Sequence, residues 1–175
     1  MKQLILGGAR SGKSSLAERL AKESGEEVIY IATAALAESD IEMDQRIRVH
    51  RDRRPETWLT IEEPVNLSGA LSQHCGAGRF LIVDCLTLWL SNILLMEEGR
   101  HFRAQTAALI RLLPELPGNL ILVGNEVGMG IVPMGEISRR FQDESGWLHQ
   151  QLAQLCDRVI LTVAGLPLTL KGEQI

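Results

Sequence analysis

A glycine-rich octet near the start of the chain has the residue types that bind phosphate. Residues 7–14 read GGARSGKS and fit the pattern G-x-x-x-x-G-K-[ST]. Glycines let successive backbone N–H groups converge on phosphate oxygens, and a helix that begins there adds its positive end. Lys13 would reach the β- and γ-phosphates as a catalytic residue, and the Ser14 hydroxyl would be a ligand of Mg²⁺. The expected phosphate-binding residues are Gly7, Gly8, Ala9, Arg10, Ser11, Gly12, Lys13 and Ser14.

The alternative for this octet is a glycine-rich turn between a strand and a helix, without a ligand. The surrounding pattern favours the phosphate site, because an apolar run precedes the octet and a helical pattern follows it.

Asp84 is the second candidate for a magnesium ligand. Residues 80–84 read FLIVD, a continuously apolar strand pattern that ends in a carboxylate. The carboxyl end of a parallel strand lies beside the phosphate site, where Asp84 would bind Mg²⁺ directly or through water. The alternative is that Asp84 caps the helix predicted to begin at Leu86.

An arginine-rich segment suggests a second reaction. Residues 44–55 read DQRIRVHRDRRP, with five arginines around His50. Helical spacing places Met43, Ile47, His50 and Arg54 on one face. One interpretation is a solvated basic helix end with an ordinary surface histidine. The other is a neutral imidazole that attacks a nucleotide phosphate while the arginines neutralise charge, and a histidine has a useful neutral fraction near pH 7.

Short apolar runs that alternate with helical patterns would position these residues. Strands are predicted at residues 2–6, 27–32, 58–62, 80–84, 119–124 and 158–163. Helices are predicted at residues 13–24, 40–54, 65–74, from 86, 102–113, and 136–156 with a possible break at Gly146. Residues 127–135 show neither the helical nor the strand periodicity of apolar residues. Strands that are apolar on both faces indicate an α/β protein with a mainly parallel sheet and helices on both faces.

Composition narrows the classes of function. The 175 residues suit a single domain over residues 1–175, with 45% hydrophobic and 23% charged residues. The net charge of −4 argues against a general nucleic-acid binder. Three cysteines without metal-type spacing argue against a disulfide scaffold and a zinc site. No apolar run has the length of a membrane span or a signal-peptide core, so a cytoplasmic location is expected.

The sequence resembles the bifunctional adenosylcobinamide kinase / adenosylcobinamide-phosphate guanylyltransferase family of cobalamin biosynthesis. The matching stretches are in order and cover nearly the whole chain. They are GGARSGKS from residue 7, YIAT from 30, RIRVHRDRRP from 46, TIE from 60, VDCLTLWLSN from 83, NEVGMGIVP from 125 and AGLPLTLK from 164. The resemblance implies a RecA-like P-loop NTPase fold and assembly as a homotrimer with active sites near subunit boundaries.

The resemblance also implies roles for individual residues. His50 matches the family's guanylylated histidine, a catalytic residue that takes GMP from GTP and passes it to the cobinamide phosphate. Further nucleotide-binding positions are Ala32, Thr33, Ala34, Arg51, Asp52, Arg53, Arg54, Glu62 and Asp84. The implied substrates are adenosylcobinamide, its phosphate, GTP and ATP, with Mg²⁺ as the metal at Ser14 and Asp84. Neither a nucleic-acid partner nor membrane insertion is expected.

Two other functions stay open at this point. One is a simple small-molecule kinase in which His50 is structural. The other is a RecA-like ATPase module that binds single-stranded nucleic acid through its arginine segment. The acidic pI of about 5.6 and the aromatic content of 4% weigh against the second, since such binders combine a basic groove with stacking rings.

Several residues with possible chemistry are set aside. His74, His101 and His149 lack the partner spacing of a metal site, so they are interpreted as surface or hydrogen-bonded histidines. Glu126 fits either a second metal-shell or base residue or a carboxylate that organises its loop. Trp89 is expected in the core or at a subunit interface.

Overall fold

One sheet runs through the protein. The computed structural model describes residues 1–34 and 54–175, and in this part of the chain the sheet has seven strands in the order β3-β2-β4-β5-β1-β6-β7. All neighbouring strands are parallel except β6 and β7, so the predicted, mainly parallel sheet is confirmed. The strands are β1 (Lys2–Gly7), β2 (Glu27–Ala32), β3 (Leu59–Glu62), β4 (Arg79–Asp84), β5 (Asn119–Asn125), β6 (Arg158–Val163) and β7 (Leu166–Lys171).

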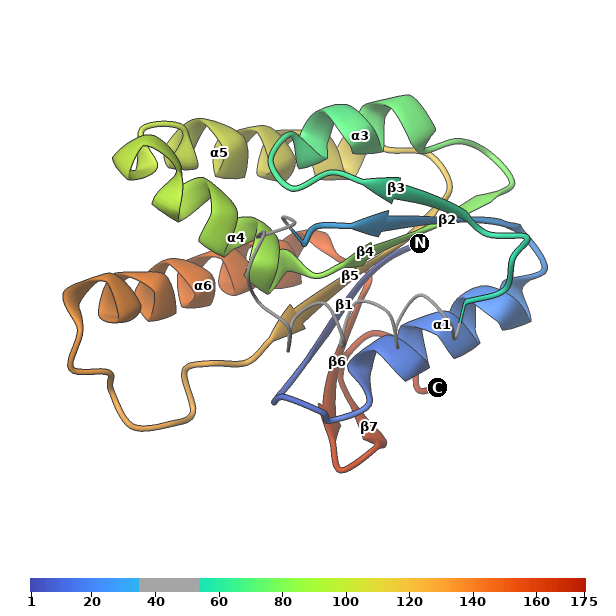
Figure 1. The fold of residues 1–175 in the computed structure, drawn as a ribbon. Coiled ribbons are helices and arrows are strands. Elements are labelled where there is room, and N and C mark those ends of the chain that lie inside the picture. Colours follow the sequence, from blue (N-terminus) through green and yellow to red (C-terminus); the bar gives the residue numbers. More distant parts are fainter. Residues whose placement is uncertain (35–53) are drawn as a thin grey trace.

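Helices cover both faces of this sheet, as predicted (Figure 1). The helix α1 (Lys13–Ser24) packs on the face that carries Ile5, Val28 and Ile82. The other face is covered by α3 (Leu67–His74), α4 (Leu86–Leu95), α5 (Phe102–Leu112) and α6 (Glu136–Leu155). Strands that bury both faces need apolar residues at every position, which explains their unbroken apolar runs. None of the described helices is both long and apolar enough to cross a membrane.

Two predicted features of the helices have different outcomes. The helix expected from Asp40 to about Arg54 lies almost wholly outside the described residues. The possible break at Gly146 is wrong, since α6 runs without interruption through it. A helical glycine costs about 1 kcal/mol relative to alanine. Leu148 and Leu152 on the same helix are buried, and burying each contributes roughly 1.5–3 kcal/mol, which outweighs the glycine.

The strand β7 was not predicted. It follows β6 through the two-residue turn Ala164–Gly165, where both residues have positive φ, 52° and 81°. Such turns match the twist of a hairpin. The alternation of Leu166, Leu168 and Leu170 was a signal of a strand, but these side chains are exposed rather than buried. An apolar strand that faces solvent breaks the inside–outside rule on which the prediction relied.

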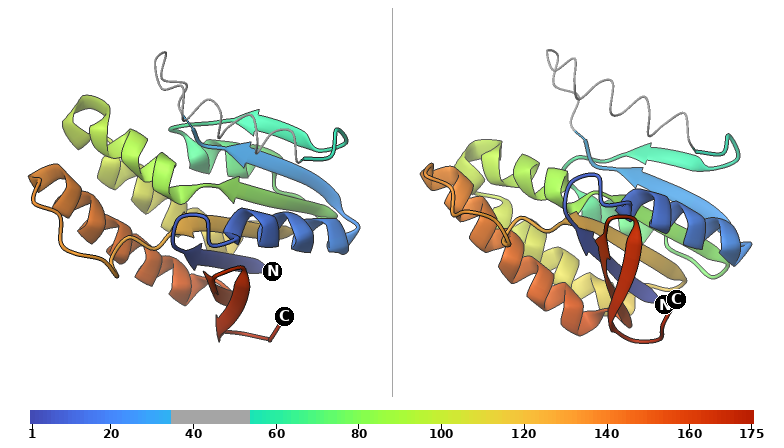
Figure 2. Two further views of the ribbon diagram at one scale, coloured as in Figure 1. Left: turned by 60° about the horizontal axis from the view of Figure 1, so that its bottom comes forward. Right: turned by 90° about the horizontal axis from the view of Figure 1, so that it is seen from below.

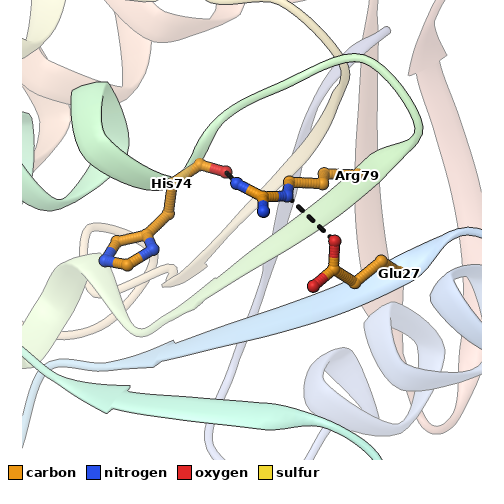
Figure 3. A network of polar contacts seen from close by, with 3 residues as sticks. All are labelled: Glu27, His74 and Arg79. Atoms are coloured by element: carbon orange, nitrogen blue, oxygen red, sulfur yellow. Dashed lines mark hydrogen bonds and ion pairs between the residues drawn. The ribbon is translucent and has the colours of Figure 1, made fainter.

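The parallel strands begin at the end of the sheet opposite the glycine-rich octet, where a polar network joins three elements (Figure 3). Arg79 Nε donates to Glu27 Oε2 at 2.9 Å, and its Nη1 donates to the carbonyl of His74 at 3.3 Å. The link joins the starts of β2 and β4 to the end of α3. The network uses the backbone carbonyl of His74 and not its imidazole. Its role is therefore to hold these three elements together. As a surface ion pair, it contributes about 1 kcal/mol or less.

Candidate functional site

The octet of residues 7–14 requires glycine at two positions. Gly7 has φ of +155°, and a Cβ there would collide with the carbonyl oxygen of Thr162 and lie 2.6 Å from Ser11 Oγ. Gly12 has φ of +96°, and a Cβ there would lie 3.2 Å from the Cα of Gly165. Both backbone conformation and space therefore exclude larger residues. These are the two glycines of the phosphate-binding pattern.

Neighbouring segments hold this loop in place. The Gly165 N–H donates to the carbonyl of Ser11 at 2.9 Å, so the β6–β7 turn supports the loop from one side. The Glu126 N–H donates to the carbonyl of Gly7 at 2.9 Å, which ties it to the end of β5. The loop is thus preorganised between two strand ends, as a site for phosphate oxygens requires.

Lys13 lies within the loop rather than in solvent. It is buried, and its Nζ donates to the carbonyl of Gly8 at 2.5 Å and to Ser11 Oγ at 3.4 Å. Burial lowers the pKa of Lys13, while the negative charge of Asp84 raises it. The loop carbonyl stabilises the ammonium, and a bound triphosphate would replace that carbonyl with phosphate oxygens. Ser14 is half-buried in the first turn of α1.

Asp84 ends β4 and does not cap the following helix. The N-cap of α4 is Cys85, and no side chain caps it, so the helix-cap interpretation of Asp84 is wrong. Its Oδ2 instead accepts a hydrogen bond of 2.6 Å from the Tyr30 hydroxyl. No cluster of three or more histidine, cysteine or acidic side chains that could hold a metal ion exists in residues 1–34 and 54–175. Mg²⁺ needs fewer protein ligands, because substrate phosphates and water supply the rest. A serine hydroxyl and a carboxylate, as Ser14 and Asp84 carry, are oxygen ligands of the kind that it takes.

Tyr30 is a residue of this site that sequence reasoning missed. Its side chain is 1% exposed, and the guanidinium of Arg54 lies 3.5 Å from the centre of its ring. Burial raises the pKa of Tyr30, and the charge of Asp84 raises it further, so the phenol stays protonated as a donor. A signal existed, since a tyrosine in a buried strand needs a partner for its hydroxyl. The strand order that puts Asp84 beside it was not readable from sequence.

The segment after β2 fastens the backbone next to Asp84. Thr33 is fully buried. Its Oγ1 donates to the carbonyl of Cys85 at 2.6 Å and accepts from the Cys85 N–H at 2.9 Å. Ala32 pairs with Glu62 on β3 and with Asp84 on β4. The predicted positions Ala32, Thr33, Glu62 and Asp84 therefore meet at one edge of the sheet, and Ala34 follows directly.

The arginine-rich segment is placed in part. Arg54 lies over Tyr30 and so comes to the same edge as Asp84. The other predicted residues of this segment lie outside the described residues: His50, Arg51, Asp52 and Arg53.

Glu126 and His149 lie at the carboxyl end of β5: Glu126 follows the strand, and His149 comes from α6. Glu126 Oε1 accepts from the Gly128 N–H at 2.6 Å, so this carboxylate organises its own loop. His149 is buried against β5, and a Cβ at Gly124 would lie 2.9 Å from its Nε2. Burial lowers the pKa of His149, and the charge of Glu126 opposes this shift. A neutral imidazole that packs against a glycine fits the interpretation as a structural histidine. Trp89 is fully buried in the core.

Comparison with known proteins identifies close relatives. A family model described as "Cobinamide kinase / cobinamide phosphate guanyltransferase" matches residues 3–170. The bifunctional adenosylcobalamin biosynthesis protein CobP of Pseudomonas aeruginosa is 58% identical over 173 residues, which are 99% of each chain. The bifunctional adenosylcobalamin biosynthesis protein CobU of Escherichia coli is 36% identical over 181 residues, covering 96% of this chain and 98% of that one.

Solved structures resemble the fold at low sequence identity. The RadB recombinase matches with a TM-score of 0.52 and 16% identity, over 91% of this chain and 73% of its own. A protein from Pyrococcus horikoshii OT3 matches with a TM-score of 0.56 and 11% identity, over 99% of this chain and 87% of its own. These similarities concern the fold alone, and they confirm the predicted RecA-like P-loop architecture.

Proposed function

Because the chain belongs to the cobinamide kinase / cobinamide phosphate guanyltransferase family, we propose that it catalyses both reactions within one domain. It phosphorylates the aminopropanol hydroxyl of adenosylcobinamide with a nucleoside triphosphate, ATP or GTP. It then transfers GMP from GTP to that phosphate and forms adenosylcobinamide-GDP. The observation that carries the proposal is the loop of residues 7–14, which hydrogen bonds from Glu126 and Gly165 hold in place. Lys13 lies inside this loop, and Asp84 lies at a nearby strand end.

The kinase reaction depends on positioning and charge. Backbone N–H groups of residues 7–14 hold the triphosphate, and the Lys13 ammonium moves from the Gly8 carbonyl to phosphate oxygens. Ser14 and Asp84 would hold Mg²⁺, which neutralises charge on the phosphates. The Tyr30 hydroxyl keeps the Asp84 carboxylate oriented. These groups place the γ-phosphate in line with the acceptor hydroxyl, and that alignment supplies most of the rate.

The guanylyl transfer needs a nucleophile. A neutral His50 nitrogen attacks the α-phosphate of GTP, a nitrogen–phosphorus bond forms, and pyrophosphate leaves. A phosphate oxygen of adenosylcobinamide phosphate then attacks the same phosphorus and frees His50. Arg51, Arg53 and Arg54 neutralise the phosphates, while Asp52 and Glu62 contact the nucleotide. The position of Arg54 over Tyr30 supports this, since Arg54 follows His50 by four residues.

Mass spectrometry of the intact protein after incubation with GTP and Mg²⁺ tests this proposal. The wild type gains one GMP, and the adduct is acid-labile and alkali-stable, as a phosphoramidate is. His50→Ala gains none and keeps part of its kinase activity. His74→Ala is the matched control, because His74 lies at the opposite edge of the sheet. A GMP that maps to Lys13 or any residue other than His50 refutes the nucleophile. Kinase activity without an adduct in the wild type favours a simple kinase.

Assembly as a homotrimer and a cytoplasmic location are further parts of the proposal. A stripe of exposed leucines on β7 supports self-association: Leu166, Leu168 and Leu170 are 72%, 56% and 58% exposed. Contiguous exposed apolar surface marks an interaction site. Sedimentation equilibrium of the wild type decides between a trimer and other states, and fractionation of cells that express it decides the location.

A further inference from the structure

The segment between β5 and α6 presents apolar side chains to solvent. Met129, Ile131, Val132 and Met134 are 78%, 96%, 65% and 97% exposed. Ile137, at the start of α6, adds to this surface with 47% exposure. Apolar residues scattered singly over a surface need no explanation, but five within nine positions of one segment mark a binding surface.

Hydrogen bonds hold this segment in shape. The Glu126 carboxylate already described fixes its start. Gln142 Nε2, from α6, donates to the carbonyl of Val127 at 2.9 Å. Arg139 Nη1 donates to the carbonyls of Pro133 and Met134 near the other end. Polar side chains of α6 thus satisfy the backbone of the segment, while its apolar side chains point outward.

A groove of about 290 Å³ lies between this segment, α4 and α6. Its wall is mainly apolar and includes Leu94, Ile137 and Phe141, with two hydroxyl groups from Ser91 and Ser138. A concave apolar wall with a few polar groups is the usual surface of a small-molecule site. The leucine stripe on β7 is instead the side of a regular strand, which suits a flat protein contact.

The groove is connected to the phosphate loop. The Glu126 N–H donates to the Gly7 carbonyl, and the Asn125 N–H donates to Thr87 Oγ1 of α4 at 2.7 Å. Val127, which lines the groove, is therefore one residue from a direct contact with the loop. Both views in Figure 2 show the segment leaving the sheet beside the turn between β1 and α1.

We propose that this groove and the apolar segment beside it bind the corrin ring of the acceptor, adenosylcobinamide. The inference rests on the proposed function. The acceptor hydroxyl must reach a γ-phosphate held by residues 7–14, so the remainder of the acceptor lies against the surface next to that loop. The ring is a large macrocycle that carries methyl groups and amide side chains. It exceeds the groove of about 290 Å³, so one part of it enters the groove and the rest lies on the exposed apolar side chains of the segment beside it. Its reacting hydroxyl stands at the end of an amide-linked chain, so the ring can sit away from the phosphates.

Two variants test the groove. Ile131→Ser combined with Met134→Ser removes apolar surface from side chains that are almost fully exposed, so the fold is retained. Ser138→Trp fills the groove from an exposed helix position. Leu59→Ser is the matched control, because Leu59 is also exposed but lies at the start of β3, away from the phosphate loop. Equilibrium dialysis measures cobinamide binding through its visible absorption, and mass spectrometry measures the GMP adduct formed with GTP alone.

Both variants are expected to weaken cobinamide binding by roughly tenfold or more. In the double-serine variant two side chains lose apolar contact, and in Ser138→Trp the indole fills the groove. Their GMP adduct and their oligomeric state by light scattering should match the wild type. Unchanged cobinamide affinity in both variants overturns the groove assignment alone. A change in oligomeric state together with the loss of affinity also overturns it, because the surface is then covered by a second copy. A wild type that fails to bind cobinamide overturns the proposed function together with the groove.

Discussion

Replacing Tyr30 by phenylalanine tests how Asp84, the proposed magnesium ligand, is held. The change removes one oxygen and keeps the ring on which Arg54 lies at 3.5 Å. The lost interaction is a 2.6 Å hydrogen bond from a phenol that is 1% exposed to the Asp84 carboxylate. A hydrogen bond to a charged group contributes about 1.5–3 kcal/mol to the free energy of unfolding. For a chain of 175 residues, each kcal/mol corresponds to about 2–4 °C, so the Tm should fall by roughly 3–12 °C.

The same change should weaken the binding of Mg²⁺. Without the phenol, the Asp84 side chain must be ordered at the moment of metal binding, and that ordering costs about 1 kcal/mol. The Mg²⁺ concentration that half-saturates binding of a fluorescent GTP analogue should rise severalfold. Because the pKa of Tyr30 is raised by burial and by Asp84, the phenol is a protonated donor throughout the neutral range, and the effect should not vary with pH there.

Circular dichroism gives the Tm, and fluorescence of the bound analogue gives the Mg²⁺ dependence. Thr106→Val is the control, since it removes a hydroxyl that donates to the Phe102 carbonyl within α5, a helix that takes no part in the contacts of Tyr30 and Asp84. The control should leave the Mg²⁺ dependence unchanged. The reasoning fails if Tyr30→Phe keeps both the wild-type Tm and the wild-type Mg²⁺ dependence.

Three further predictions concern the ionisable side chains of Lys13, Asp84 and His149. Lys13→Ala should lose both activities, because each needs the triphosphate held in the loop; full guanylylation of this variant at ordinary GTP concentrations would refute the shared site. Asp84→Asn should weaken Mg²⁺-dependent turnover while the fold survives, and an unchanged Mg²⁺ titration would remove it from the metal site. Burial lowers the pKa of His149 in the folded protein below that of the unfolded chain. Its contribution to stability is therefore complete above about pH 6.5 and is lost as the pH falls through the folded pKa. His149→Gln should flatten the acid-side decline of Tm, and a decline identical to that of the wild type would exclude this group.

Much of the nucleotide site follows from short stretches of sequence. The start of α1 at Lys13 and its end at Ser24 were predicted, because the glycine-rich loop, the helical period and Gly25 act within a few residues of one another. The strands β2, β4 and β5 were predicted for a similar reason, since a strand buried on both faces needs an unbroken apolar run. The family resemblance was also evident from motifs in order along the chain, and the family match over residues 3–170 confirms it.

The tertiary structure decided which side chains meet across the sheet. Asp84 had two interpretations until β2 was found next to β4, which brings the Tyr30 hydroxyl to its carboxylate. Arg54 meets the Tyr30 ring only because the chain returns to the sheet edge before β3. The strand β7 was missed because its leucines face solvent, and its turn proved to support the phosphate loop through Gly165. Local backbone preference and burial act over a few neighbouring residues, so sequence patterns reveal them. Strand order depends on the packing of the whole chain, so contacts between residues far apart in sequence appear only in the folded protein.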